Sequence, residues 1–238
     1  MSEGVTGSGG DAATAQPGAH EPRVVRVGIV DDDTMVRSLL RTIVTARGME
    51  VVGEADDGDG AVDLVQRHHP DVLLMDLRMA RMSGVEATRA VRALPSAPGV
   101  VALTSFDTPA TIRDAVAAGV QGFLAKDVGP DELESALRQV AAGEGALSPR
   151  AARVVLEQAR SEDEGARRRA SARLAALSER ERDVAERVTR GLSNPEIARE
   201  LFLSESTVKT HLNAALTKSG AANRVQLAVL VTEGSWLT

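Results

Sequence analysis

Five short apolar runs, each followed by a stretch with helical periodicity, occupy the chain from residue 24 to about residue 142. The runs are VVRVGIV, EVVGEA, DVLLMD, GVVALTS and VQGFLAK. Continuous apolar strands that alternate with helices are typical of a parallel sheet covered by helices on both faces. Five units are too few for an eight-unit barrel, so the pattern predicts an open, doubly wound, five-stranded α/β fold.

The composition limits the kind of protein that this chain can be. Cys is absent from the 238 residues, which excludes disulfide frameworks, thiolate metal sites and cysteine nucleophiles. No apolar run approaches the roughly 18 residues that span a bilayer. Residues 1–22 lack the basic start and apolar middle of a signal peptide, and their Gly, Ala, Ser and Pro content predicts a disordered leader. We therefore expect a soluble, cytoplasmic protein with no membrane partner.

The C-terminal part has a different pattern, which is entirely helical from Leu174. Ser178 and Glu181 have the spacing of a capping box, and Pro195 stands in the first turn of the next helix, where its missing N–H costs little. The intervening segment is charged and has no apolar stripe, so it predicts a linker that is at most partly helical. The expected organisation is a leader at 1–22, an α/β domain at 23–143, a linker at 144–173 and a small all-α domain at 174–238.

The net charge of −6 is unevenly distributed along the chain. Residues 1–144 hold 13 basic and 22 acidic side chains, whereas residues 174–238 hold eight of each. An acidic front domain disfavours nucleic acid, and a neutral back domain must bind a polyanion through locally placed charge. One copy of that domain should therefore bind any polyanion weakly, so we expect useful occupancy to need two copies acting together.

Polar side chains gather where the predicted strands end. They are Asp31, Asp32 and Asp33 after the first strand, Asp76 at the end of the third, Thr104 and Ser105 after the fourth, and Lys126 after the fifth. In an open parallel sheet, ligands bind outside the carboxyl ends of the strands. Two carboxylates about 4 Å apart repel by roughly 4 kcal/mol at an effective dielectric constant near 20. Mg²⁺, which prefers oxygen ligands, would remove that cost, and an Asp beside it can attack phosphorus to form an acyl phosphate.

The acidic pair and the segments VLLMDLRM, ALTSF and GFLAKD occur in the order and spacing of the receiver domain of bacterial response regulators, which residues 24–142 resemble. The roles that this resemblance implies are phosphoacceptor for Asp76, metal ligands for Asp31, Asp32 and Asp76, phosphoryl contacts for Thr104 and Lys126, and switch residues for Thr104 and Phe123. Without the resemblance, Phe123 also fits ordinary packing and Thr104 an ordinary strand-end hydroxyl. Asp33 stands at a variable position of the family.

The loop after the third strand departs from the family pattern. Many relatives have a Pro-Gly pair where this chain has Ala80 and Arg81, and often carry Asp where Ser83 stands. No chemical group of the acidic site is lost by these changes. We expect them to alter the loop after Asp76 and the lifetime of a phosphoryl group there.

The segment ESTVKTHLNAALTKSG places Val208, Leu212 and Ala215 on one helical face, opposite a short polar face. With the short helix and tight turn before it, the pattern is typical of a helix-turn-helix, although it also fits a solvated helix in a plain bundle. Residues 177–230 resemble the C-terminal domain of NarL/FixJ-type (LuxR-type) regulators. That resemblance implies a four-helix module that binds double-stranded DNA as a dimer, with contacts from Thr207, Lys209, Thr210, His211 and Asn213. The final helix, NRVQLAVLV, would make the dimer contact or pack in the core.

Together the resemblances imply a transcriptional response regulator rather than an enzyme. A sensor histidine kinase would phosphorylate Asp76, with Mg²⁺ as cofactor, and the inward movement of Phe123 would help to control dimerisation and DNA binding. An Asp-nucleophile phosphatase of the haloacid dehalogenase type is one alternative, because DDDTM at 31–35 approaches its motif, but Met35 stands where Thr or Val is needed. Another alternative is a regulator that binds DNA without phosphorylation and uses its receiver for dimerisation or sensing.

Overall fold

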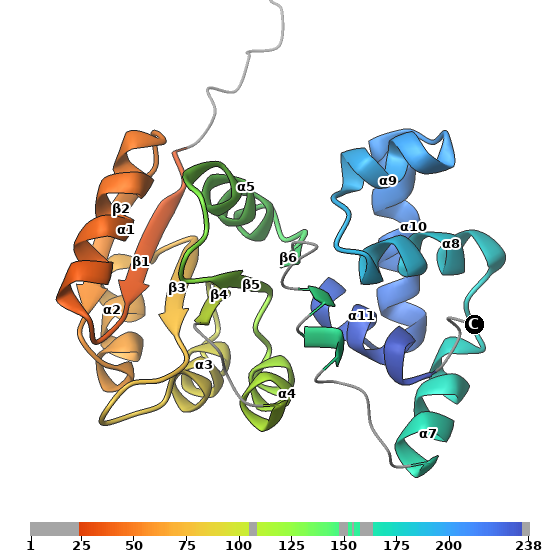
Figure 1. Ribbon diagram of the computed structural model, residues 1–238, viewed down its shortest axis with the longest axis horizontal. Helices are drawn as coiled ribbons and strands as arrows, with labels where there is room; N and C mark the ends of the chain where they lie inside the picture. The colour runs from red at the N-terminus through yellow and green to blue at the C-terminus, as the bar shows by residue number, and fades with distance from the viewer. Residues whose placement is uncertain (1–23, 105–108, 148–151, 154, 158–163, 235–238) are drawn as a thin grey trace, which may run out of the picture.

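The computed structural model describes residues 24–104, 109–147, 152–153, 155–157 and 164–234, which form an α/β domain and a helical domain lying side by side (Figure 1). Six parallel strands in the order β2-β1-β3-β4-β5-β6 make up the sheet of the first domain. These strands are β1 (Arg26–Val30), β2 (Glu50–Ala55), β3 (Val72–Asp76), β4 (Gly99–Thr104), β5 (Gly122–Ala125) and β6 (Ala146–Leu147). The predicted doubly wound parallel fold is confirmed, with one short strand added at the edge.

Helices cover both faces of the sheet, as the apolar strands require. They are α1 (Thr34–Ala46), α2 (Ala61–His68), α3 (Gly84–Arg92), α4 (Pro109–Ala118) and α5 (Pro130–Ala141), with a short 3-10 turn, η1 (Gly58–Gly60), before α2. The apolar faces of α1 and α5 form one core with the sheet, and those of α2, α3 and α4 belong to a second core on the other face. The central strands of the sheet are therefore covered on both faces, and their ends are the places where its residues can meet a ligand.

Strand β3 lies in the middle of the sheet and is buried along its whole length. Its apolar residues have no exposed surface, and Asp76 at its last position is 5% exposed. The register aligns Asp76 with Leu103 of β4 and Met75 with Val30 of β1. The apolar run thus carries an acid to the carboxyl edge of the sheet, next to the end of β1.

Side-chain caps fix where the helices around this edge begin. Asp33 caps α1 by accepting hydrogen bonds from the N–H groups of Met35 and Val36, at 2.8 and 3.3 Å. Ser83 caps α3 in a capping box with Glu86. Caps of this kind satisfy backbone donors that have no partner inside the helix, and these two hold the loops on either side of the strand ends.

The helical domain consists of α7 (Glu164–Leu174), α8 (Glu179–Thr189), α9 (Asn194–Leu201), α10 (Glu205–Ser219) and α11 (Arg224–Glu233). The expected capping box of Ser178 and Glu181 is present at α8, and Pro195 stands in the first turn of α9. The turn between α9 and α10 passes through Phe202, whose φ is 55°. Helices α9 and α10 thus form the helix-turn-helix that the sequence predicts.

The segment expected to be a linker contributes to both domains. Its residues Ala146 and Leu147 form β6, which pairs with β5 and extends the sheet. Helix α7 at its far end packs on α11 in the helical domain, with Ala170 and Leu174 buried. Among the residues that the structure describes, no helix is both long and apolar enough to cross a membrane.

Candidate functional site

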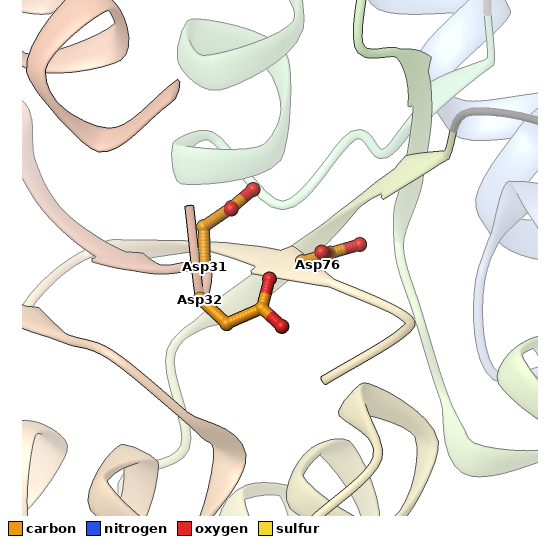
Figure 2. Close-up of side chains that lie close together, drawn as sticks. All are labelled: Asp31, Asp32 and Asp76. Carbon is orange, nitrogen blue, oxygen red and sulfur yellow. The ribbon is translucent and has the colours of Figure 1, made fainter. Parts of the chain in front are cut away.

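Three carboxylates from two neighbouring strand ends meet at the carboxyl edge of the sheet (Figure 2). Asp31 and Asp32 follow β1, and Asp76 ends β3. One carboxylate oxygen from each of the three lies within 4.8 Å of the other two. The ammonium of Lys126, which follows β5, lies 2.7 Å from Asp76 Oδ2 and 2.8 Å from Asp31 Oδ2. The structure therefore brings together four of the residues that the sequence assigned to this site.

The carboxylates differ in exposure and in their partners. Asp31 is fully buried, and its Oδ1 accepts a hydrogen bond from the N–H of Asp33 at 2.9 Å. The Oδ1 of Asp76 accepts a hydrogen bond from the N–H of Arg78 at 3.2 Å, and its Oδ2 accepts one from Lys126. Asp32, in contrast, is exposed. The site thus has a buried floor and one acid at its mouth.

Burial and charge compete in setting the pKa values here. Burial is the largest influence on Asp76 and raises its pKa, although the hydrogen bond from Lys126 opposes it. Burial alone would lower the pKa of Lys126, but its close contacts with the carboxylates of Asp31 and Asp76 outweigh burial, and the pKa is raised. Lys126 therefore stays cationic, while the ionised form of Asp76 carries a cost that a further positive charge would relieve.

The oxygen atoms of the site fit a hard divalent cation. Three carboxylates converge, and the donor set contains no nitrogen or sulfur. Asp31 Oδ2 is buried and touches the Lys126 ammonium, yet no hydrogen bond of good geometry reaches it within the described part of the chain. Mg²⁺ is held by one or two carboxylates and keeps several waters. Asp31, Asp32 and Asp76 could therefore hold it, with its waters on the solvent side near Asp32.

The remaining predicted residues of the receiver have mixed outcomes. Thr104 ends β4, where its backbone pairs with Ala125, but its side chain lies outside the described residues. Phe123 is completely buried in the core on the α4 face. Its role as a switch residue stays a prediction. Asp33 caps α1, which gives it a structural role.

The loop after Asp76 is fastened to the loop after β2. Arg81 makes ion pairs with Asp56 and Asp59 at 2.9 and 2.7 Å. Asp57, which is 1% exposed, accepts hydrogen bonds from the N–H groups of Arg81 and Met82 at 2.9 and 2.8 Å. The replacement of the family's Pro-Gly pair thus supplies an arginine that ties two loops together. The sequence pointed to Arg81 as a departure but gave no sign of its partners.

Gly84 is a second contributor that the sequence analysis missed. A Cβ at this position would collide with the carbonyl oxygen of Asp76. The first residue of α3 therefore packs directly on the backbone that carries the acceptor acid, and only glycine leaves room for it. The sequence feature that could have predicted this role is a glycine at the first position of a helix, directly after the capping residue Ser83.

The recognition helix α10 presents its predicted DNA-contacting residues outward. Lys209, Thr210 and Asn213 are exposed, and Thr207 and His211 are half-buried. Its apolar side is packed inside the domain through Val208, Leu212 and Ala215. Ser204 caps the helix, and its hydroxyl also contacts that of Thr207 at 2.7 Å.

The helical domain also touches the α/β domain. Asn223 Nδ2 donates to the carbonyl of Val120 at 3.1 Å, and Gln226 Nε2 donates to that of Val116 at 3.1 Å. These contacts place α11, the helix expected to make a dimer contact or to pack in the core, against α4 and the edge strand β6 (Figure 1). No pattern in the sequence predicts this contact between the domains.

Two family models match the chain over separate ranges. The response regulator receiver domain matches residues 27–138, and the luxR family of bacterial regulatory proteins matches residues 175–231. The two ranges correspond to the sheet domain and the helical domain described above.

Proteins of known sequence and structure resemble the chain over most of its length. The uncharacterized transcriptional regulatory protein YxjL of Bacillus subtilis is 38% identical over 208 residues, covering 86% of this chain and 94% of YxjL. The nitrate/nitrite response regulator protein NarL of Escherichia coli is 33% identical, covering 85% and 93%. The crystal structure of the response regulator ChrA, from a heme-sensing two-component system, is 33% identical with a TM-score of 0.50, covering 87% and 96%.

Proposed function

The chain belongs to the two-component response regulators that join a receiver domain to a LuxR-type DNA-binding domain, and we propose that phosphorylation of Asp76 controls its binding to DNA. Members of this family are transcription regulators, not enzymes. A sensor histidine kinase supplies the phosphoryl group in this proposal. Since its target is chromosomal DNA, the cytoplasm is the location that we propose.

The convergence of Asp31, Asp32, Asp76 and Lys126 is the observation that supports phosphorylation. A carboxylate oxygen of Asp76 attacks the phosphorus of a phosphohistidine, the P–N bond breaks, and the imidazole leaves as the new P–O bond forms an acyl phosphate. Lys126, already 2.7 Å from Asp76, is positioned to contact the phosphoryl oxygens. Asp31, Asp32 and Asp76 would hold Mg²⁺, which would neutralise charge on the transferred group. We assign a further phosphoryl contact to the hydroxyl of Thr104.

The joint between the domains supports control of DNA binding. Lys209 on the recognition helix lies 2.8 Å from Glu144, which follows α5, and α11 packs on α4 and β6. In this closed arrangement Lys209 is paired with Glu144 and one side of α11 is covered, so both contacts must be released before these groups can serve DNA binding and pairing. We propose that phosphorylation favours an open arrangement, in which two copies pair and engage DNA, because the two states differ in these contacts.

Labelling with a phosphodonor tests the acceptor. Acetyl phosphate should label the parent protein in the presence of Mg²⁺ and should not label Asp76→Asn. Asp63→Asn, an exposed acid on α2 that pairs with Arg67, makes the same change of charge away from the site and should leave labelling intact. Equal labelling of the parent and Asp76→Asn would refute the assignment.

DNA binding tests the coupling. Genome-wide footprinting with the parent and Asp76→Asn in parallel should reveal sites that only the phosphorylated parent occupies. Beryllofluoride, a phosphoryl mimic, should strengthen binding of the parent to those sites. Binding that ignores beryllofluoride would instead favour a regulator whose receiver serves only in dimerisation or sensing.

A further inference from the structure

The carboxylate of Glu144 is bound by two groups of the DNA-binding domain. Its Oε1 lies 2.8 Å from the ammonium of Lys209 on α10, and its Oε2 accepts a hydrogen bond from Asn194 Nδ2 at 3.2 Å. Asn194 is the first residue of α9, where the positive end of the helix dipole favours an anion. One acidic side chain of the receiver is thus held by a basic and a polar group of the helix-turn-helix.

Arg224, the first residue of α11, adds a cation to the same place. It is 2% exposed, and only its Nη2 has a hydrogen bond, to the carbonyl of Leu192 at 2.6 Å. Nε and Nη1 have no partner among the described residues. Burial lowers the pKa of Arg224 to about 10, against the opposing charges of Glu144 and Glu196.

The receiver covers this arginine. A Cβ on Gly145 would meet Arg224 Cγ at 2.9 Å, so the backbone after Glu144 lies directly against the stem of the side chain. Removing a charged group from water without a full set of partners is costly. The guanidinium of Arg224 has N–H donors without acceptors in the described part of the chain, although a carboxylate is bound nearby. This favours an anion with more acceptor oxygens at this place once the receiver moves away.

The donors suit an oxyanion with several acceptor oxygens. An ammonium, an amide N–H, a guanidinium and a helix N-terminus all favour negative oxygen, and guanidinium matches phosphate especially well. Lys209 lies on the helix that enters the major groove, and the first helix of such a pair crosses the DNA backbone. We propose that Asn194, Lys209 and Arg224 form a seat for a backbone phosphate of DNA, and that Glu144 occupies this seat in the closed arrangement.

This proposal rests on the proposed function and adds two DNA-binding residues, Asn194 and Arg224, to those of the recognition helix. It also differs from a simple latch in one testable respect. If Asn194 only fastened Glu144, then Asn194→Asp would repel Glu144, open the joint and strengthen DNA binding. If Asn194 belongs to a phosphate seat, the same substitution opens the joint and yet weakens DNA binding, because Asp also repels the phosphate.

The experiment measures binding of full-length protein, with beryllofluoride and Mg²⁺, to a mixed-sequence DNA duplex across a range of salt concentrations. The slope of log K against log salt is negative, and each lost phosphate contact decreases its magnitude by about 0.9. We expect that decrease, with a several-fold loss of affinity, for Asn194→Asp and for Arg224→Gln. Inorganic phosphate, compared with chloride at equal ionic strength, shows whether a free anion also competes for the seat.

Controls separate the seat from folding and from net charge. An acid in the first turn of α9 favours the helix, so Asn194→Asp should keep its melting temperature even if the buried Arg224→Gln does not. Gln66→Glu and Arg67→Gln make the same changes of charge on α2, on the far side of the receiver from the joint (Figure 1), and should leave the slope unchanged. An unchanged slope for folded Asn194→Asp overturns the seat alone. A parent protein that binds no duplex overturns the proposed function with it.

Discussion

At the acidic edge of the sheet, Asp31 and Asp76 share the ammonium of Lys126. At the joint around Glu144, by contrast, two nitrogens of the buried Arg224 find no hydrogen-bond partner in the described part of the chain. The first site is built on the ends of three strands of one sheet. The second is assembled from groups of two domains. The charges at the acidic edge are compensated whenever the receiver is folded. The charges at the joint are compensated only in part, and only while the two domains are in contact. The receiver thus holds its chemical groups within one fold and its regulatory contacts in a weaker joint between two domains.

The largest expected effect comes from removing the shared cation. Lys126→Met leaves two buried carboxylates beside each other, and breaking a buried ion pair costs about 3–5 kcal/mol. Because the Lys126 side chain is 20% exposed, we expect the receiver to lose about 3 kcal/mol without divalent cations. Hydrogen exchange of the β1 and β3 amides measures the loss. The control Arg67→Met, at an exposed ion pair, should cost less than about 0.5 kcal/mol; equal costs would remove the distinction between the two kinds of site.

Crowding the backbone of the acceptor acid should have the next largest effect. Gly84→Ala forces a methyl group against the carbonyl of Asp76, and overpacking of this kind costs about 1–3 kcal/mol. Denaturant unfolding should show this loss, and labelling by acetyl phosphate should slow. Gly129→Ala, at a glycine with open space around it, serves as the control and should change stability by less than about 1 kcal/mol. A tolerated Gly84→Ala would mean that this edge of the sheet is less rigid than its packing indicates.

Loosening the joint should have a smaller effect. Glu144→Gln removes the ion pair with Lys209, which is 52% exposed, so the closed arrangement should lose about 0.5–1 kcal/mol. DNA affinity of the unphosphorylated protein should then rise by about two- to fivefold, since 1.4 kcal/mol corresponds to tenfold. Glu132→Gln, at an exposed acid on α5, should change nothing. A destabilised receiver in Glu144→Gln would show that the joint is as integral to the fold as the acidic edge.

The smallest expected effect is a pH dependence of the acidic edge. Burial raises the pKa of Asp76 against the hydrogen bond from Lys126, so its ionised form lowers stability above the folded pKa, and protonation removes this cost as pH falls. Without divalent cations, Asp76→Asn should therefore be more stable than the parent at neutral pH. The difference should shrink in acid and vanish below the unfolded pKa of about 3.9. Thermal melts across this range measure it, and a difference that grows in acid would contradict the assigned direction.

The two sites also differ in how far the sequence reveals them. Asp76 and Lys126 could be placed because each ends an apolar strand, and parallel strands bring their carboxyl ends to one edge. Glu144 lies in a charged stretch that predicts only a linker, and Arg224 begins a helix whose pattern predicts a core or dimer contact. Neither local pattern predicts that one domain packs on the other, because that packing depends on residues far apart in the chain. The partners of Arg81 escaped prediction for the same reason.

Strand β6 has a consequence for how the two domains can part. Its two residues pair with Gly122 and Phe123 of β5, and an unpaired strand edge is a template for association with another chain. Glu144 and Gly145 precede this strand, so Lys209 and Arg224 can leave them without pulling β6 from the sheet. If the domains part as proposed, β6 therefore stays paired with β5, and the edge of β5 remains covered against association with another chain.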